Sequence, residues 1–329
     1  MQSVTVLGGG SWATALVKIL SNNAPHIQWW MRNQEAVDFI HQYRHNPGYL
    51  SDVEIDLQKV RPGSGLEEAL AASDLIVLAV PAAFLNTTLK GLTPASFEGK
   101  TVFSAIKGIV PEHNLIVGDF MHRIFGVPYE KVGVITGPCH AEEVALEKLS
   151  YLTVACPDAD TSAGMAELLT CRYIRTVVSD DIFGTEYAAV LKNIMAIASG
   201  ICHGAGYGDN FQAVLISNAI REIKRFVDAV YPMNRDINDS AYLGDLLVTA
   251  YSQFSRNRTF GSMIGKGYSV KSAQMEMNMI AEGYYAVACV HEINKKLGLH
   301  LPICQAVYHI LYEKISARLE MKLLTEQLS

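Results

Sequence analysis

Near its start the chain reads Val4-Thr5-Val6-Leu7-Gly8-Gly9-Gly10-Ser11-Trp12-Ala13, a β-type run followed by three glycines and the beginning of an apolar-periodic stretch. The glycines fit the pattern G-x-G-x-x-A between a strand and a helix. Gly8 permits the turn, Gly10 lets a pyrophosphate approach the backbone, and the small Ala13 lets the helix lie near the sheet. The N–H groups at the start of the helix then bind phosphate charge. This stretch predicts a dinucleotide-binding turn.

The rest of the first half alternates short β-type runs with amphipathic stretches, which is typical of βαβ units around a parallel sheet. The run at residues 75–80 is apolar on both alternating faces, as expected for an interior parallel strand. Between the first two runs, apolar residues recur at helical spacing over residues 11–23. The predicted strands occupy residues 4–7, 27–31, 75–80, 101–106, 132–136, 151–156 and 173–178.

After about residue 180 the pattern changes to long, apolar-periodic stretches that are poor in β-type runs. We therefore predict an α/β, Rossmann-like N-terminal domain with a mostly parallel sheet (residues 1–180) and an all-α C-terminal domain (residues 181–329). Predicted helices occupy residues 185–201, 214–230, 239–251 and 281–297, and a last one starts at Pro302 and runs toward residue 319.

Composition narrows the classes of partner. The 329 residues include 27 Lys plus Arg and 33 Asp plus Glu, a net charge of −6, which lacks the broad basic field that nucleic acids require. Cationic side chains gathered at one place would instead favour a small anionic ligand. The longest apolar stretch, near residues 75–85, contains Pro81 and is too short to cross a bilayer.

The first strand begins close to the first residue and leaves no room for a signal peptide, and the six cysteines show no CxxC pair or zinc-type spacing. We expect a cytoplasmic protein without a metal site and without stable membrane insertion.

The end of the second predicted strand bears on the choice of cofactor. An Asp or Glu there would favour NAD, because a carboxylate bonds the 2′-hydroxyl of the ribose and repels a 2′-phosphate. The chain has Arg32-Asn33 instead. Arg32 is either a receptor for the 2′-phosphate, stacked on adenine, or a solvated surface residue. On the first interpretation, NADPH is used at least as well as NADH.

Lys192 and Asn193 interrupt an otherwise apolar helix. Lysine is almost never fully buried without a partner. Two interpretations are open for Lys192: its stem extends to the surface, or it is held in a cleft with a lowered pKa, ready to exchange a proton.

Two further groups of basic residues can be interpreted either as parts of a binding site or as ordinary solvent-exposed residues. Lys107 lies just beyond the carboxyl end of a predicted strand, where open α/β sheets bind ligands. Ser255-Arg256-Asn257-Arg258 follows a helical run and is predicted to begin another helix, which would place guanidinium groups beside N–H groups suited to a phosphate. Each is otherwise a loop lysine or a solvated basic turn.

Taken together, these motifs resemble the bacterial-type NAD(P)-dependent glycerol-3-phosphate dehydrogenases. The resemblance extends over about residues 4–315, with the motifs in the order that the family has. They are Gly8–Ala13, Val80-Pro81 with Phe84, Ile106-Lys107-Gly108, Gly137-Pro138 with Ala141, Leu191-Lys192-Asn193, Leu243-Gly244-Asp245-Leu246, Ser255-Arg256-Asn257-Arg258 and Glu282-Gly283.

The resemblance implies reversible hydride transfer between NAD(P)H and dihydroxyacetone phosphate, giving sn-glycerol 3-phosphate for glycerophospholipid synthesis. By similarity, Lys192 is the general acid/base, Lys107 contacts substrate and cofactor, and Asp245 binds substrate and orients the lysines. The positions that match substrate contacts in the family are Lys107, Gly137, Cys139, Asn193, Asp245, Ser255, Arg256 and Asn257.

The cofactor implied is NADP(H), NAD(H) or both. The positions that match cofactor contacts are Gly8, Gly10, Ser11, Trp12, Arg32, Phe84, Lys107, Ala141, Arg256, Ile280 and Glu282. One departure concerns Cys139-His140, where many relatives have Thr or Ser followed by Phe, because a thiol is a weaker hydrogen-bond partner than a hydroxyl.

Two rival functions keep the same architecture. A ketopantoate- or 3-hydroxyacid-type reductase would use the Arg256-Asn257 turn to hold a carboxylate in place of a phosphate. A non-catalytic NAD(P)H sensor would need no proton relay, and four residues together argue against it: Lys192, Lys107, Asp245 and Arg256. We expect a small-molecule substrate and a homodimer.

Overall fold

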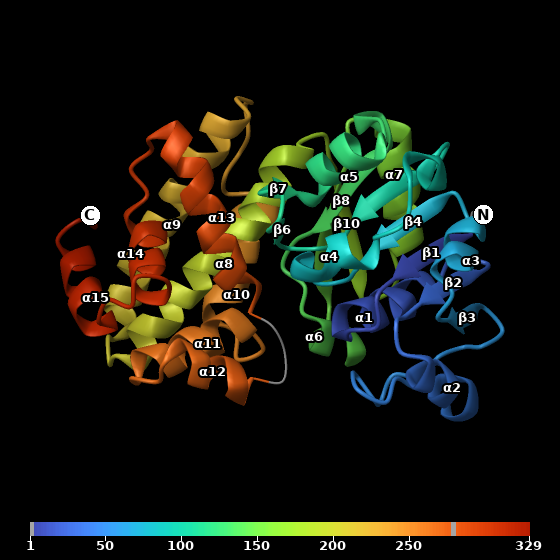
Figure 1. Cartoon of the computed structure of the whole chain (residues 1–329), viewed down its shortest axis with the longest axis horizontal. Coiled ribbons are helices and arrows are strands. Elements are labelled where there is room, and N and C mark those ends of the chain that lie inside the picture. The colour runs from blue at the N-terminus through green and yellow to red at the C-terminus, as the bar shows by residue number, and fades with distance from the viewer. Residues whose placement is uncertain (1–2, 278–280) are drawn as a thin grey trace. The chain divides into compact units, whose positions relative to one another are not determined.

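The computed structural model describes residues 3–277 and 281–329, and the chain divides into two compact units (Figure 1). Neither unit is a single continuous segment, because two short stretches of the first half belong to the second unit. The first unit comprises Met1–Val80, Phe84–Ile106 and Val117–Ile182, and the second comprises Pro81–Ala83, Lys107–Ile116 and Phe183–Ser329.

An eight-stranded sheet forms the centre of the first unit, with strand order β10-β9-β8-β5-β4-β1-β2-β3. All neighbouring strands are parallel except β8 and β9, so the expected mostly parallel sheet is confirmed. The strands are β1 Val4–Leu7, β2 Ile27–Trp30, β3 Val60–Gly63, β4 Leu75–Leu78, β5 Thr101–Ser104, β8 Val132–Thr136, β9 Ser150–Ala155 and β10 Ile174–Ser179.

Helices connect these strands as parallel crossovers require. Helix α1 packs against β1, β2, α6 and α7, whereas α5 packs against β5 and β8. The helices are α1 Ser11–Leu20, α2 Gln34–Tyr43, α3 Leu66–Ala71, α4 Ala82–Thr88, α5 Val117–Phe125, α6 Ala141–Ala145 and α7 Ala159–Leu169, with short 3₁₀ turns at Pro94–Phe97 and Tyr129–Lys131.

The core of this unit follows from the sequence pattern. Every residue of β1 and β4 is buried, which for β4 confirms the prediction from the apolar run at residues 75–80. Alternation is absent because helices cover both faces of a parallel sheet. The strand order reverses between β1 and β4, and open α/β sheets bind ligands beyond the carboxyl ends of strands at such a point.

Helix α8 (Ile182–Gly204) runs through the second unit and is buried along most of its length. Other helices surround it (Figure 1). Its apolar side chains form one buried cluster with those of these helices. The other helices are α9 Asp209–Val230, α10 Asp245–Tyr251, α11 Arg256–Gly265, α12 Val270–Glu276, α13 Glu282–Leu297, α14 Pro302–Leu311 and α15 Ala317–Thr325.

Three features of the second unit differ from the sequence prediction. A hairpin of β6 (Ile109–Val110) and β7 (Leu115–Ile116) joins this otherwise helical unit, and Ile109 and Ile116 enter its core. The stretch predicted as one helix from residue 239 begins with the π-helical turn Ser240–Gly244. The prediction of one last helix running toward residue 319 is wrong, because α14 ends at Leu311 and a separate helix, α15, begins at Ala317.

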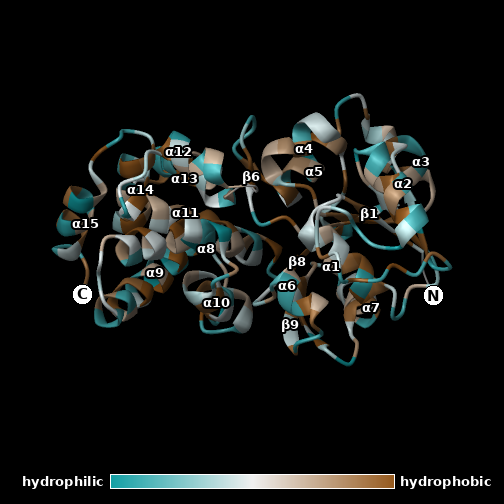
Figure 2. Cartoon of the chain, turned by 90° about the horizontal axis from the view of Figure 1, so that it is seen from below, coloured by the Kyte–Doolittle hydropathy of each residue, from teal (hydrophilic) through white to brown (hydrophobic). Residues whose placement is uncertain are grey.

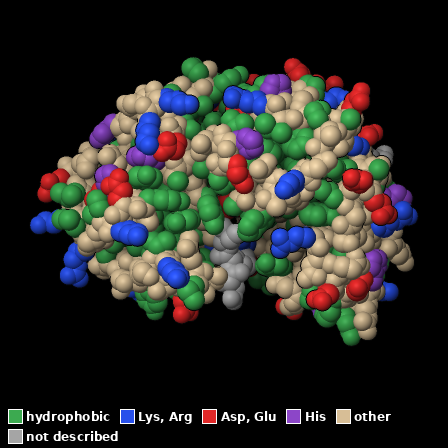
Figure 3. Space-filling model, in the orientation of Figure 1, with side chains coloured by type: hydrophobic (Ala, Val, Ile, Leu, Met, Phe, Trp, Pro, Cys, Tyr) green, Lys and Arg blue, Asp and Glu red, His purple; other side chains and the backbone are tan. Residues whose placement is uncertain are grey.

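The face shown in Figure 3 carries Lys and Arg interspersed with Asp and Glu. Helices such as α15 combine hydrophilic and hydrophobic residues along one element (Figure 2). Among the described residues, no helix has the length and apolar character needed to span a bilayer.

Candidate active site

Lys192, in the middle of α8, is buried beside a carboxylate. Its side chain is 5% exposed, and its Nζ donates to Oδ1 of Asp245, which is 1% exposed. Nζ of Lys107 lies 3.1 Å from the other oxygen, Oδ2. One buried carboxylate therefore holds two ammonium groups, and all three residues belong to the second unit. Of the two interpretations of Lys192, the structure supports the buried, paired lysine.

The backbone around these groups explains why they are buried. The residues one helical turn before and after Lys192 on the same face of α8, Ala188 and Ala196, are buried, so that face gives the lysine no route to solvent. Asp245 is the first residue of α10 and follows the π-helical turn directly. Single π-helical turns are rare and occur frequently at functional sites.

Burial and charge act on this pair in opposite directions. Burial lowers the pKa of the Lys192 ammonium to about 7, and the nearby Lys107 lowers it too, whereas the Asp245 carboxylate raises it. For Asp245, burial alone would raise the pKa, but the two lysines outweigh burial and hold the pKa below its usual value. A lysine whose pKa lies near neutrality is suited to exchanging a proton.

Thr249 is part of this cluster, and the sequence analysis missed it. Its Oγ1 lies 3.0 Å from Nζ of Lys192, which donates to it, and donates to the backbone oxygen of Asp245 at 2.6 Å. The signal was present, because residues four apart on a helix share a face, so a threonine at this distance from Asp245 lies beside it.

Asn193 orients the loop that carries Lys107. Its Nδ2 donates to the backbone oxygen of Lys107 at 2.8 Å. The predicted substrate contact therefore has a structural task that its position in the sequence did not reveal. Because Asn193 follows Lys192 directly on α8, one turn of helix fixes both lysines relative to Asp245.

The basic turn begins a helix, as predicted. Ser255 caps α11, and its Oγ accepts from the N–H of Arg258 at 3.3 Å. Asn257 is buried and its Oδ1 accepts from the N–H of Gly283 at 2.9 Å, which joins the start of α11 to the start of α13. Arg256, the first residue of α11, is partly exposed. A guanidinium beside the N-terminus of a ten-residue helix is suited to an anion.

Glycines bring these helices close to α8. A Cβ on Gly261 of α11 would lie 2.1 Å from the backbone oxygen of Ile197, and one on Gly200 of α8 would lie 2.1 Å from that of Arg258. A Cβ on Gly283 would lie 2.6 Å from the backbone oxygen of Asn193. The starts of α11 and α13 are therefore held against the part of α8 that carries the buried lysine.

Glu282 lies at the same junction. Its Oε1 accepts from the N–H of Ala82, while its Oε2 is buried without a hydrogen-bond partner among the described residues. Oε2 would lie 2.6 Å from a Cβ on Gly108, so a larger residue there would displace the carboxylate. Burial raises the pKa of Glu282 to about 7, and the nearby Arg256 partly offsets that shift.

In the first unit, the glycine turn has the geometry that a dinucleotide needs. Gly8 has φ +141°, and a Cβ on it would lie 2.5 Å from the backbone oxygen of Ala79, so only glycine fits. A Cβ on Gly10 would meet no heavy atom within 4 Å, and no side chain caps α1 there. Open space beside an uncapped helix start fits the pyrophosphate of a dinucleotide.

The remaining predicted residues of the first unit lie around its strand ends and loops. Arg32 and Phe84 are exposed, Trp12 is partly exposed, and Ser11, Cys139 and Ala141 are buried. Gly137 has φ +111°, and a Cβ on it would lie 2.9 Å from the backbone oxygen of Tyr151 in β9. Ile280 lies outside the described residues.

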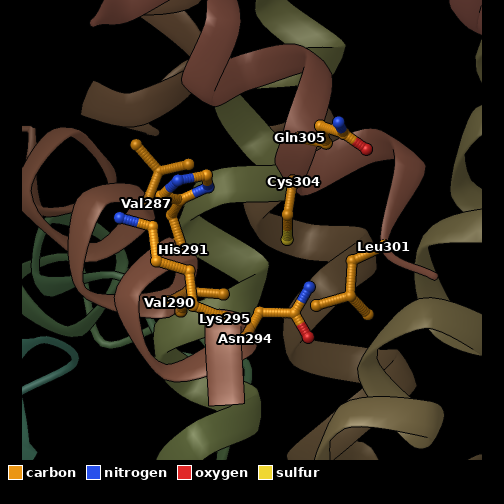
Figure 4. A pocket seen from close by; sticks show the side chains of 8 residues that line it. All are labelled: Val287, Val290, His291, Asn294, Lys295, Leu301, Cys304 and Gln305. Atoms are coloured by element: carbon orange, nitrogen blue, oxygen red, sulfur yellow. The ribbon is translucent and has the colours of Figure 1, made fainter. Parts of the chain in front are cut away.

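A cavity elsewhere in the second unit does not include any predicted site residue (Figure 4). There the ring of His291 stacks on Tyr308 with centroids 3.7 Å apart. The cavity is lined by Val287, Val290, His291, Asn294, Lys295, Leu301, Cys304 and Gln305. No cluster of three or more potential metal ligands occurs among the residues that the structure describes.

Comparison with known proteins identifies the family to which both halves of the chain belong. Residues 3–162 match the model of the N-terminal part of NAD-dependent glycerol-3-phosphate dehydrogenase, and residues 181–322 match that of its C-terminal part. The chain belongs to this family. The resemblance stated from the motifs is thereby confirmed, and the enzyme class is that of the NAD(P)-dependent oxidoreductases.

Individual members of the glycerol-3-phosphate dehydrogenase family match the whole chain. One from Exiguobacterium is 36% identical over 323 residues, which cover 98% of this chain and 94% of the relative. One from Staphylococcus carnosus is 33% identical and is covered to 98%, as is this chain. A crystal structure of the dehydrogenase from Coxiella burnetii superposes with a TM-score of 0.90 at 28% identity and 99% coverage of both chains.

Proposed function

We propose that the protein interconverts dihydroxyacetone phosphate and sn-glycerol 3-phosphate with NADPH or NADH. The observation that carries the proposal is the buried Lys192 ammonium, paired with Asp245 beside Lys107, in a chain of this family. A carbonyl reduced by hydride needs a proton at its oxygen, and this cluster supplies a group whose pKa lies near neutrality.

In the reduction, Lys192 donates its proton to the carbonyl oxygen of the substrate. Lys107 stabilises the negative charge that develops on that oxygen, because an ammonium in a water-poor site interacts strongly with it. Asp245 keeps both lysines in place, and Thr249 holds the lysine amine when it is neutral. In the oxidation, the neutral Lys192 accepts the proton from the hydroxyl group.

The start of α11 binds the phosphate of the substrate. Arg256 supplies positive charge, and the first N–H groups of the helix add to it. Ser255 and Asn257 fix this turn through the caps described above. The family positions of Gly137 and Cys139 complete the proposed substrate contacts, with Asn193 supporting Lys107.

A dinucleotide bound at the glycine turn supplies the hydride. The turn and the start of α1 bind its pyrophosphate through Gly8, Gly10, Ser11 and Trp12. Arg32 binds the 2′-phosphate of NADPH. The other proposed contacts are Phe84, Lys107, Ala141, Arg256 and Glu282. In the cell, we place the protein in the cytoplasm as a homodimer that supplies glycerol 3-phosphate for phospholipid synthesis.

The test is oxidation of NADPH and NADH, in parallel, with dihydroxyacetone phosphate as the only substrate. We expect turnover, with NADPH used at least as well as NADH, and we expect Arg32→Ala to reduce use of NADPH more than use of NADH. Folded protein that turns over neither cofactor overturns the proposal. Turnover with ketopantoate or a 3-keto acid in its place points to a carboxylate reductase, and tight cofactor binding without any turnover points to a sensor.

A further inference from the structure

The three carbonyl groups of the glycine turn each have a hydrogen-bond donor from elsewhere in the first unit or from α1. The buried indole of Trp29 donates to the oxygen of Gly8 at 2.7 Å. Asn46 donates to the oxygen of Gly9 at 3.1 Å. The N–H and the hydroxyl of Thr14 both donate to the oxygen of Gly10 at 3.0 Å.

These bonds fix which way the N–H groups of the turn point. In a trans peptide, the C=O of one residue and the N–H of the next point in opposite directions. Holding the Gly9 oxygen against Asn46 therefore directs the N–H of Gly10 to the opposite side of the chain. Backbone N–H groups directed in this way bind the oxygens of a phosphate.

The side chain of Asn46 is buried and held by several hydrogen bonds. It is 2% exposed, although it lies in the loop after α2, which a left-handed Arg44 (φ 61°) terminates. Its second donor contact is Oγ1 of Thr14 at 2.9 Å, and its Oδ1 accepts from the N–H of Gly48 at 3.0 Å. These three hydrogen bonds are all made within the protein. They also fix the orientation of the Asn46 side-chain amide, because a flipped amide would place its oxygen against the Gly9 carbonyl oxygen.

We propose that Asn46 is a positioning residue for cofactor binding, which holds the Gly9–Gly10 peptide so that the Gly10 N–H faces the dinucleotide pyrophosphate. This inference rests on the proposed function only in assuming that the turn binds a dinucleotide. Since NADPH, NADH and ADP-ribose share the pyrophosphate, losing Asn46 weakens all three by a similar factor. Arg32, in contrast, affects ligands with a 2′-phosphate more than those without one.

The experiment measures dissociation constants for NADPH, NADH and ADP-ribose by titration calorimetry with the full chain. We expect Asn46→Ala to raise all three about tenfold, which is about 1.4 kcal/mol and near the value of one hydrogen bond. In steady-state assays the KM for the cofactor rises by a similar factor, while kcat changes less.

Asn23 provides a matched control. It is another asparagine of the first unit, and its Nδ2 donates to the backbone oxygens of Glu167, Leu168 and Thr170, away from the turn. Asn23→Ala removes a comparable loop anchor, so it lowers thermal stability and leaves the three dissociation constants unchanged. If Asn23→Ala weakens cofactor binding as much as Asn46→Ala does, the effect is general destabilisation and the inference fails.

The outcomes separate this inference from the proposed function. Native protein that binds neither cofactor nor ADP-ribose overturns the dinucleotide site itself. Native protein that binds them, with Asn46→Ala binding within twofold, overturns the role of Asn46 alone. If Asn46→Ala does not fold, Thr14→Val takes its place, because it removes the hydroxyl that accepts the second Asn46 N–H; we expect a two- to fivefold loss, and unchanged binding refutes the inference.

Discussion

At the scale of single residues, the Asp245 carboxylate pairs with both Lys107 and Lys192 in the proposed site. Two ammonium groups and one carboxylate leave a net positive charge in a buried place, within a chain of net charge −6. Such an arrangement attracts an anionic substrate and still keeps each buried charge paired. The carboxylate also limits how far burial lowers the pKa of Lys192.

Lys192→Ala is expected to lower kcat by about 100-fold or more, because it removes the group that exchanges the proton. Steady-state kinetics with dihydroxyacetone phosphate and saturating NADPH measure the effect, and circular dichroism checks the fold. Lys224→Ala is the control, since Lys224 forms an exposed pair with Asp228 on α9 and should leave kcat unchanged. Near-native kcat in folded Lys192→Ala would reject the acid/base role.

The pH dependence of the two directions should be opposite. The pKa of Lys192 is lowered from 10.5 to about 7 by burial, so the ammonium form disappears as the pH rises through about 7. Ketone reduction needs the ammonium and should fall above that pH, whereas alcohol oxidation needs the neutral amine and should rise. Profiles of kcat/KM between pH 5 and 10 measure both limbs, namely the fall of the reduction rate and the rise of the oxidation rate.

Asp245→Asn gives this profile its control. The substitution removes the carboxylate that raises the pKa of Lys192, so burial acts without opposition and both limbs should move to lower pH. Limbs that stay where they are in this variant would show that a group other than Lys192 is titrating. Limbs near pH 10 in the native enzyme would contradict the lowered pKa of Lys192.

Single residues also show what the sequence alone can predict. Lys192 was detectable because a charged residue in an apolar helix violates the usual pattern, and Asp245 followed from the family resemblance. Thr249 and Asn46 were not detected, because threonine in a helix and asparagine in a loop are ordinary in composition. Their roles come from hydrogen bonds between residues that folding brings together, such as Asn46 with Gly9, 37 positions apart.

At the scale of elements, glycines determine how closely α11 approaches α8. Gly200 and Gly204 on α8 face Gly261 and Gly265 on α11, and a Cβ on any of them would lie within about 2.2 Å of a backbone oxygen of the other helix. The helices therefore touch backbone to backbone. This contact places the first turn of α11, with Arg256, at a fixed distance from the part of α8 that carries Lys192.

Gly261→Ala should lower the free energy of unfolding by about 1–3 kcal/mol, because the new methyl group meets the Ile197 carbonyl and the helices must separate. Urea denaturation measures it, and KM for the phosphate substrate should rise in the same variant. The control is Gly164→Ala in α7, where a Cβ has no neighbour within 4 Å and the substitution should stabilise by about 0.4–1 kcal/mol. Equal midpoints for the two variants would contradict the packing argument.

Two elements show why the fold was predicted only in part. Strand β3, with the sequence Val-Arg-Pro-Gly, was missed because proline and glycine are typical of turns, yet an edge strand tolerates proline. The break between α14 and α15 was missed because no glycine or proline marks it; Lys314 adopts the left-handed conformation there (φ 59°). The elements β1, β4 and α8 were predicted well because tertiary packing and local pattern agree in them.

At the scale of the molecule, each unit has its own apolar core. The core of the first unit surrounds the sheet, and that of the second surrounds α8. A unit that buries its own apolar surface responds to a ligand bound within it by local stabilisation. The glycine turn lies in the first unit and the lysine pair with the α11 start in the second, so two kinds of ligand should protect two different regions.

Hydrogen exchange followed by mass spectrometry should show this division. ADP-ribose, which has the pyrophosphate and lacks nicotinamide, should slow exchange most in residues 8–20. Glycerol 3-phosphate alone should slow it most in residues 255–265, at the start of α11. Glycerol 3-phosphate that protects only the first unit, or ADP-ribose that protects only α11, would contradict the proposed assignment of cofactor and substrate.

Because segments of the two units alternate along the chain, the gene cannot be cut at one point into two parts that each encode a complete unit. A gene fragment that starts at Phe183 would encode most of the second unit but would omit Lys107 and the hairpin side chains of Ile109 and Ile116 that fill its core. Such a fragment could not fold and function as an independent domain, because Lys107, one of the two lysines of the proposed site, and part of its interior are encoded upstream. Splitting or recombining this enzyme would therefore require cuts that carry residues 107–116 together with the C-terminal half.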